Sequence, residues 1–186
     1  MTTTLVLVGI AVAVIFYVIY LYNTLVKNRQ SVEEGWSGID VQLKRRSNLI
    51  PNLLAAVKGY MKHEKGLLED ITRMRSRAND VADKGPAERG KAEGALGAGL
   101  LNLFAVMENY PDLKANQNVM DFQNSLSEIE DQIQMSRRYY NGAVRIMNVS
   151  VEAFPSNLVA NKFDFIKAEF FEIEDAAVKQ VPKVEF

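Results

Sequence analysis

The amino-terminal stretch from Leu5 to Tyr22 constrains this chain more than any other part of it. Its residues are almost all apolar or aromatic, and no Asp, Glu, Lys or Arg occurs before Lys27. At a helical rise of about 1.5 Å per residue, the stretch spans about 27 Å, close to the hydrocarbon thickness of a bilayer. The sequence therefore predicts one membrane-spanning helix, with residues 1–22 as an anchor.

Two other interpretations compete for this stretch. A cleavable signal peptide has a basic amino end, a shorter apolar core and small residues at the cleavage site. Here no basic residue precedes the stretch, and it is followed by Asn23, Thr24 and Leu25. A buried core helix is also disfavoured, because a soluble domain of this size seldom hides a helix that is apolar on every side for so long.

The two ends of the stretch differ, and this difference predicts its orientation. Tyr17, Tyr20 and Tyr22 stand at the carboxyl end, where aromatic rings favour the membrane interface, and Lys27 and Arg29 follow them. No Lys or Arg lies on the other side. The positive-inside rule then places the amino terminus outside and the rest of the chain in the cytoplasm. These five residues are the candidates for membrane-interface contacts.

Composition excludes several classes of function. The net charge is −1 and the chain has no Cys. A nucleic-acid-binding protein normally has a strong basic excess, so nucleic acid is not an expected partner. The lack of Cys rules out disulfides, thiolate catalysis and Cys-ligated metals, and it fits a reducing compartment.

After the anchor, apolar or long side chains recur in steps of three and four, which is the heptad spacing of one helix face. We therefore expect the membrane helix to continue until Pro51, where residues 47–52 should kink or end it. The stripe belongs either to a core or to a contact between subunits, and its candidates are Leu25, Val32, Trp36, Ile39 and Leu43.

Three more helices are predicted, which makes residues 23–154 an all-α antiparallel bundle. The first covers about 50–83, the second begins at Pro86 after a turn and stops at 110–112, and the third covers about 116–153. Glycines at positions 90, 94 and 97 have two interpretations: they allow a neighbouring backbone to approach closely, or they leave the start of the helix poorly formed.

Residues 155–186 form an aromatic tail. Helical periodicity fails after Phe154-Pro155, and Val178–Phe186 is irregular. Disordered segments are poor in aromatic residues, so we expect the tail to pack on its own bundle or on a neighbouring subunit. The residues expected to make this contact are Phe163, Phe165, Phe170 and Phe171.

No set of residues predicts a reaction. The single histidine, His63, has Leu67 where a zinc-binding helix needs a second histidine, and Tyr60 where a di-metal bundle needs a glutamate. The glycines of 94–99 do not match a phosphate-binding loop. The carboxylates lie on charged helix faces, where solvation accounts for them. We therefore predict no catalytic, cofactor-binding or metal-binding residue, and no enzyme.

Several longer motifs together resemble the LemA family. They are Asn23-Thr24-Leu25-Val26-Lys27-Asn28-Arg29, Trp36-Ser37-Gly38-Ile39-Asp40-Val41-Gln42-Leu43-Lys44-Arg45-Arg46, Leu49-Ile50-Pro51-Asn52-Leu53, Val57-Lys58-Gly59-Tyr60, His63-Glu64, Arg137-Arg138-Tyr139-Tyr140-Asn141-Gly142-Ala143-Val144-Arg145 and Phe154-Pro155-Ser156-Asn157. Gln30, Gly35 and Asn48 depart from the family pattern. The resemblance implies a bacterial single-pass inner-membrane protein with a cytoplasmic helical bundle. It brings no catalytic residues with it, and it implies a magnetosome-membrane protein among the relatives.

The expected function is a non-enzymatic scaffold that self-associates in the membrane and organises or remodels it. An alternative is a tethered adaptor that presents its bundle to one partner, such as a protease or a transporter. A third class, an enzyme or a small-ligand sensor, requires a polar pocket inside the bundle. The expected partners are the lipid bilayer and other copies of the chain, with another membrane protein as the partner in the adaptor alternative. Subunit number, lipid preference and signal do not follow from the sequence.

Overall fold

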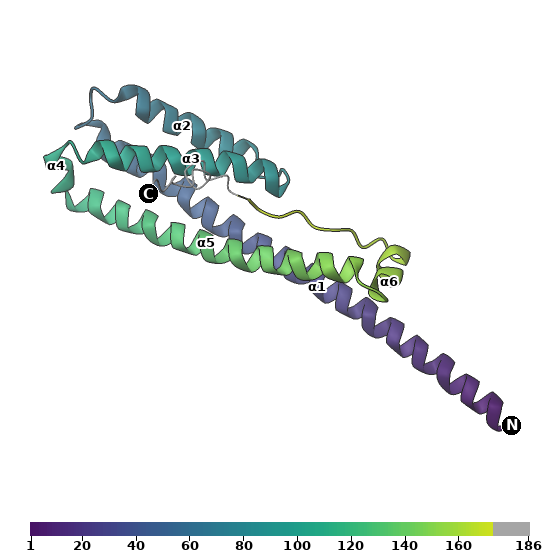
Figure 1. Cartoon of the computed structure of the whole chain (residues 1–186). Coiled ribbons are helices and arrows are strands. Elements are labelled where there is room, and N and C mark those ends of the chain that lie inside the picture. Colours follow the sequence, from purple (N-terminus) through teal and green to yellow (C-terminus); the bar gives the residue numbers. More distant parts are fainter. Residues whose placement is uncertain (173–186) are drawn as a thin grey trace, which may run out of the picture. The chain divides into compact units, whose positions relative to one another are not determined.

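The computed structural model describes residues 1–172, and every regular element within them is an α-helix (Figure 1). The helices are α1 (Thr2–Lys58), α2 (Lys65–Asp80), α3 (Pro86–Met107), α4 (Pro111–Lys114), α5 (Gln117–Glu152) and α6 (Ser156–Lys162). The predicted all-α class is confirmed, as is the apolar helix at the amino end. The predicted irregular stretch Val178–Phe186 lies outside the described residues.

The first helix does not end at residues 47–52, which is one of the two outcomes predicted there. α1 continues through Pro51 to Lys58. A proline inside a helix leaves the carbonyl four residues earlier without its usual donor, and here that carbonyl belongs to Ser47. The Nε of Arg75 donates a hydrogen bond to it at 2.7 Å. The side chain from α2 thus supplies the missing donor, and the helix passes the proline.

The break between the first two helices lies further along the chain than predicted. The helix expected over 50–83 is wrong, because residues 50–58 belong to α1 and α2 begins only at Lys65. Between them, Met61 turns into the apolar core and is 1% exposed. The Oη of Tyr110 donates a hydrogen bond to Glu64 at 3.3 Å near the end of this turn. A turn at Gly59 therefore places Met61 inside, where a continuous helix was expected.

The later helices follow the sequence more closely. Pro86 is at the start of α3, and the bounds of α5 differ from the predicted 116–153 by one residue at each end. The sequence missed the short helices α4 and α6. Both begin next to a proline, at Pro111 and after Pro155, where the sequence indicated only that a longer helix stops.

The chain divides into two compact units. Unit 1 contains Met1–Gly38 and Ser136–Glu169, and unit 2 contains Ile39–Met135 and Phe170–Phe186. Each unit therefore takes one part of α1 and one part of α5.

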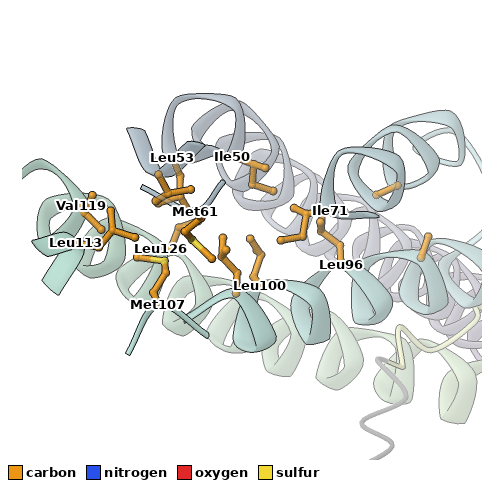
Figure 2. Packing of buried hydrophobic residues seen from close by; sticks show 14 residues of the cluster. Ile50, Leu53, Met61, Ile71, Leu96, Leu100, Met107, Leu113, Val119 and Leu126 are labelled. Atoms are coloured by element: carbon orange, nitrogen blue, oxygen red, sulfur yellow. The ribbon is translucent and has the colours of Figure 1, made fainter. Parts of the chain in front are cut away.

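Unit 2 has a large apolar core. Figure 2 shows buried side chains of α1, α2, α3 and α5 meeting inside it, among them Ile50, Ile71, Leu96 and Leu126. The pairs Arg46 with Glu130 and Tyr60 with Asn116 show that the two long helices run antiparallel in this unit. α2 and α3 form a helical hairpin, because only a short turn joins them.

The glycines of α3 let neighbouring groups come close. A Cβ added to Gly90 would lie 2.2 Å from the backbone oxygen of Glu172, and one added to Gly99 would lie 2.9 Å from the Sδ of Met74. Both distances are too short for a larger residue without movement of the neighbour. Of the glycines singled out in the sequence, Gly90 shows the close approach of a backbone, whereas a Cβ added to Gly97 would make an ordinary contact with Arg46 at 3.6 Å. α3 is fully formed around both.

Unit 1 is built on a pair of antiparallel helix segments. A Cβ added to Gly35 on α1 would lie 3.0 Å from the Cα of Tyr140 on α5, so the two backbones nearly touch there. Its core is small and brings together residues from α1, α5, α6 and the segment that follows α6. The buried members are Leu25, Met147, Val159, Ala160 and Phe165.

Candidate functional site

The apolar segment of α1 is the clearest functional feature of the chain. Within residues 1–172, α1 is the one helix long and apolar enough to cross a membrane, by length and composition. None of its most apolar window is buried by the rest of the described protein. This exposure distinguishes the membrane-spanning interpretation from the core-helix interpretation. A helix in the core of a soluble protein would be mostly covered, whereas this segment is not.

An aromatic and basic cluster surrounds the end of that segment in unit 1. The ring of Tyr22 meets Phe163 edge to face, with centroids 4.9 Å apart, and Phe165 at 5.7 Å. The guanidinium of Arg29 lies over the ring of Phe165, 5.4 Å from its centroid. Phe165 of the tail therefore contacts two of the predicted membrane-interface residues, Tyr22 and Arg29.

The other three predicted membrane-interface residues lie apart from this cluster. Tyr17 and Tyr20 are half or more exposed, and Lys27 is exposed as well. Their side chains are therefore available to the surroundings of the helix.

The structure places the predicted subunit-interface residues in two groups. Leu25, Ile39 and Leu43 are buried within the chain itself, as are Phe165 and Phe171 of the tail. Val32 and Trp36 are partly buried, and Phe163 and Phe170 are exposed. Most of the stripe is thus covered without a second copy.

The segment after α6 is tied to α5 by polar contacts. The side chain of Asn148 exchanges two hydrogen bonds with the backbone of Ala168, at 2.8 and 3.0 Å. The Oη of Tyr140 donates to the backbone oxygen of Glu169 at 2.8 Å. Asn28 on α1 donates to the Oγ of Ser150 at 2.8 Å. Unit 1 is held by such contacts as much as by its small core.

Tyr140 is the most strongly perturbed titratable group of unit 1. Its ring packs against that of Trp36, with centroids 5.4 Å apart. Burial, followed by the nearby charge of Glu169, raises the pKa of the Tyr140 phenol to about 12. The group therefore stays neutral at physiological pH and acts as a hydrogen-bond donor in the structure.

Unit 2 contains a buried ion network that sequence reasoning missed. Arg46 on α1 is 2% exposed and Glu93 on α3 is 4% exposed. The Nη2 of Arg46 lies 2.6 Å from the Glu93 carboxylate, and its Nη1 lies 2.9 Å from the more exposed Glu130. The prediction that the carboxylates lie on solvated helix faces is wrong for Glu93. A second pair joins Arg89 to Asp40 at 2.5 Å.

The concave surfaces of unit 2 that lie within residues 1–172 are lined by few groups that could act in catalysis. One groove, of about 600 Å³, is lined by apolar side chains together with three lysines, one glutamate and one threonine. A smaller hollow of about 230 Å³ lies beside Asp40, Arg89 and Glu93, whose charges are engaged in the ion pairs above. His63 is exposed and belongs to neither lining. No cluster of metal-binding side chains occurs within residues 1–172.

Comparison with known proteins gives a consistent group of relatives. The LemA family model matches residues 35–186. The chain is 29% identical to Protein LemA of Metamycoplasma hominis, over 87% of this chain and 74% of that protein. It is 26% identical to Magnetosome protein MamQ 2 of Paramagnetospirillum magneticum and 23% identical to Magnetosome protein MamQ of Magnetospirillum gryphiswaldense, in each case over 89% of this chain and 70% of the relative.

The names of these relatives describe no reaction, and together with the exposed apolar segment they indicate a membrane-associated protein. The match to the family model extends from α1 to the end of the chain, and the motifs noted in the sequence fall largely inside it. This protein belongs to the LemA family.

Proposed function

We propose that the protein is a non-enzymatic scaffold of the bacterial inner membrane, anchored by a single span, with its amino terminus outside and its helical units in the cytoplasm. The observation that carries this proposal is the apolar segment of α1, of whose most apolar window the described chain buries no residue. A bilayer is the environment in which such a segment is stable. Lys27 and Arg29, which follow the segment, support the cytoplasmic side for the rest.

The proposal includes self-association in the plane of the membrane. Because Leu25, Ile39 and Leu43 are covered by the chain's own helices, contacts between copies fall to surfaces that remain exposed. Among these surfaces are the apolar segment itself and Phe170. Relatives that are named as magnetosome proteins support a role in organising or remodelling membrane.

Topology and assembly are tested separately. Because the chain has no Cys, Thr2→Cys and Leu101→Cys each create a single labelling site. In intact spheroplasts, an impermeant maleimide is expected to label position 2 at once and position 101 only after permeabilisation. The reverse pattern contradicts the orientation. Light scattering in nanodiscs is expected to give a multiple of the chain mass, and a strict monomer that also resists cross-linking in membranes contradicts the scaffold.

The groove of unit 2 favours a second candidate, a tethered adaptor for one partner protein. Its floor includes Leu54, Met61 and Leu68, and Lys58 and Lys62 lie at its edge. Such a surface fits an amphipathic helix that carries acidic residues beside its apolar face.

One substitution separates the two candidates. Leu68→Glu places a negative charge in the groove, and it is expected to release a stoichiometric partner if the protein is an adaptor. The mass of the native assembly in lipid should stay unchanged if the protein is a scaffold. A variant that releases no partner and keeps its assembly mass argues against the adaptor.

A further inference from the structure

Unit 1 exposes a group of large apolar side chains that lie in the turn after α5, in α6 and just after α6. We call this group the α6 corner, and it consists of Phe154, Leu158, Phe163 and Ile166. Phe154 is 80% exposed, Leu158 is 60% exposed and Ile166 is 79% exposed. Clustered apolar residues that are exposed to this extent mark a contact with a partner or a membrane.

The register of the helices places this corner at the end of the apolar segment. α1 and α5 run antiparallel in unit 1, and Asn28 on α1 meets Ser150 on α5. Two residues further along α5, its last residue Glu152 stands at the level of about Val26, since both helices rise by about 1.5 Å per residue, and Phe154 follows two residues after the helix ends. The apolar segment ends at Tyr22, so the corner and the end of the segment share one level.

A direct contact agrees with this register. The ring of Phe163 lies against that of Tyr22, at 4.9 Å between centroids. Figure 1 shows α6 beside α1 in unit 1, near the part of α1 that then extends without a neighbour. The exposed surface of the corner is therefore continuous with the exposed surface of the segment.

The opposite face of α6 holds the corner in place. Val159 and Ala160 are buried in the small core of unit 1 with Leu25 of α1 and Met147 of α5. Leu158 is directed away from that core, because its neighbour in sequence occupies the buried face. The corner is thus a fixed surface on α1 and α5.

The charges around the corner have both signs, with a small basic excess. Lys27, Lys162 and Lys167 are exposed, and Arg29 is also at the surface. The acidic groups are Asp164, which is exposed, Glu152, which forms an ion pair with Lys167, and Glu33, which lies 3.9 Å from Arg29. Basic residues beside exposed aromatic and aliphatic side chains are typical of helices that lie in the interface of a bilayer with anionic lipid.

We propose that the α6 corner inserts into the interface of the bilayer that α1 crosses, as a second membrane contact made by the same chain. This inference rests on the proposed anchoring by α1. A spanning helix alone leaves the protein free to tilt and to rotate about one axis. A second contact at α6 fixes the tilt and the rotation of unit 1. It also accounts for apolar side chains that water would otherwise surround.

Three single-cysteine variants of the full chain test this proposal. Ile10→Cys, Ile146→Cys and Leu158→Cys replace aliphatic residues of nearly equal exposure, at 57%, 58% and 60%. Ile10 belongs to the apolar segment, Leu158 to the corner, and Ile146 to α5, about 12 Å before Phe154 along the helix axis. Each variant is labelled with an environment-sensitive nitrobenzoxadiazole dye and placed in vesicles of phosphatidylcholine and phosphatidylglycerol that contain nitroxide-labelled lipid.

The expected result is strong quenching at position 10 by a nitroxide deep in the acyl chains. At position 158, a nitroxide near the headgroups should quench several-fold more than at position 146. Quenching at position 158 no greater than at position 146, with position 10 still quenched, overturns the second contact and leaves the anchor in place. An unquenched dye at position 10 overturns the anchor itself. A blue-shifted dye at position 158 that lipid nitroxides do not quench means that protein covers the corner, which also overturns the proposal.

Discussion

Unit 1 and unit 2 each use one part of α1 and one part of α5, but they bury their side chains differently. Unit 2 encloses a broad apolar core and places the ion pair of Arg46 and Glu93 inside it. Unit 1 has a small core, joins its parts by aromatic and polar contacts, and leaves Phe154, Leu158 and Ile166 in the open. Unit 2 thus buries its main apolar cluster by itself, whereas the exposed apolar surface of unit 1 fits the proposed contact with lipid.

The largest expected effect concerns the buried charges of unit 2. Glu93→Ala leaves the Arg46 guanidinium buried without its nearest carboxylate, and we expect a loss of about 3–5 kcal/mol in the free energy of unfolding. Glu130→Ala removes a partner that is exposed and should cost about 1 kcal/mol or less. Urea unfolding of the full-length protein in detergent, followed by far-UV circular dichroism, measures both. If the two variants lost the same free energy of unfolding, the burial of the carboxylate would not determine the cost of removing it.

The next effect tests the close packing of α3. Gly90→Ala forces a Cβ against the backbone oxygen of Glu172, which is not the end of a flexible side chain. We expect a loss of about 1–3 kcal/mol, even though alanine favours a helix. The same urea experiment measures this change. A variant as stable as the parent chain would mean that the segment at 172 moves aside without cost.

A smaller effect and a pH dependence are expected for Tyr140 in unit 1. Tyr140→Phe removes the hydrogen bond to Glu169 and should cost about 1 kcal/mol at neutral pH. The free tyrosine has a pKa of 10.0, and in the folded protein the value is about 12. The unfolded chain therefore loses this proton first as the pH rises, so the stabilisation is fully present below pH 10 and is lost between 10 and about 12.

The measurement for Tyr140 is the stability difference between the parent chain and Tyr140→Phe across that pH window. It is expected to shrink as the pH rises. Tyr139→Phe gives the comparison with an exposed phenol, whose pKa is raised by its hydrogen bond to Glu34 at 3.2 Å, so its stability difference is also expected to shrink as the pH rises. A difference for Tyr140→Phe that does not change with pH would contradict the raised pKa.

The smallest effect has the opposite sign and also falls in unit 1. Gly142 lies inside α5, and a Cβ there would meet nothing within 4 Å. Gly142→Ala is therefore expected to stabilise the protein by about 0.5–1 kcal/mol through helix propensity alone. The midpoint of urea unfolding should rise. Gly90→Ala is expected to lower this midpoint. The opposite signs of the two changes would distinguish a glycine on an open helix surface from a glycine in close contact.

The sequence predicted features that depend on nearby residues. The start of α3 follows from Pro86, and the length of α5 follows from its regular apolar spacing. The features that it missed depend on distant partners. Glu93 reads as a surface carboxylate, because the residue that makes its burial tolerable, Arg46, lies 47 positions away.

The same reason explains what was missed around the proposed membrane contact. Tyr22 and the aromatic tail were each singled out, but nothing in their spacing indicated that Tyr22 meets Phe163 and Phe165. The stripe from Leu25 to Leu43 is predicted to pack in a core or between subunits, and Leu25, Ile39 and Leu43 are buried within the chain itself. Periodicity alone does not say whether that partner is another copy or the chain's own α5.

The hydrogen bond between Arg75 and the Ser47 carbonyl limits how the sequence can change in evolution. As long as position 51 is proline, position 75 must hold a side chain that can reach and donate to that oxygen. A chain with alanine at position 51 would restore the ordinary amide and release position 75 from this requirement. Across homologous sequences, these two sites are therefore expected to change together.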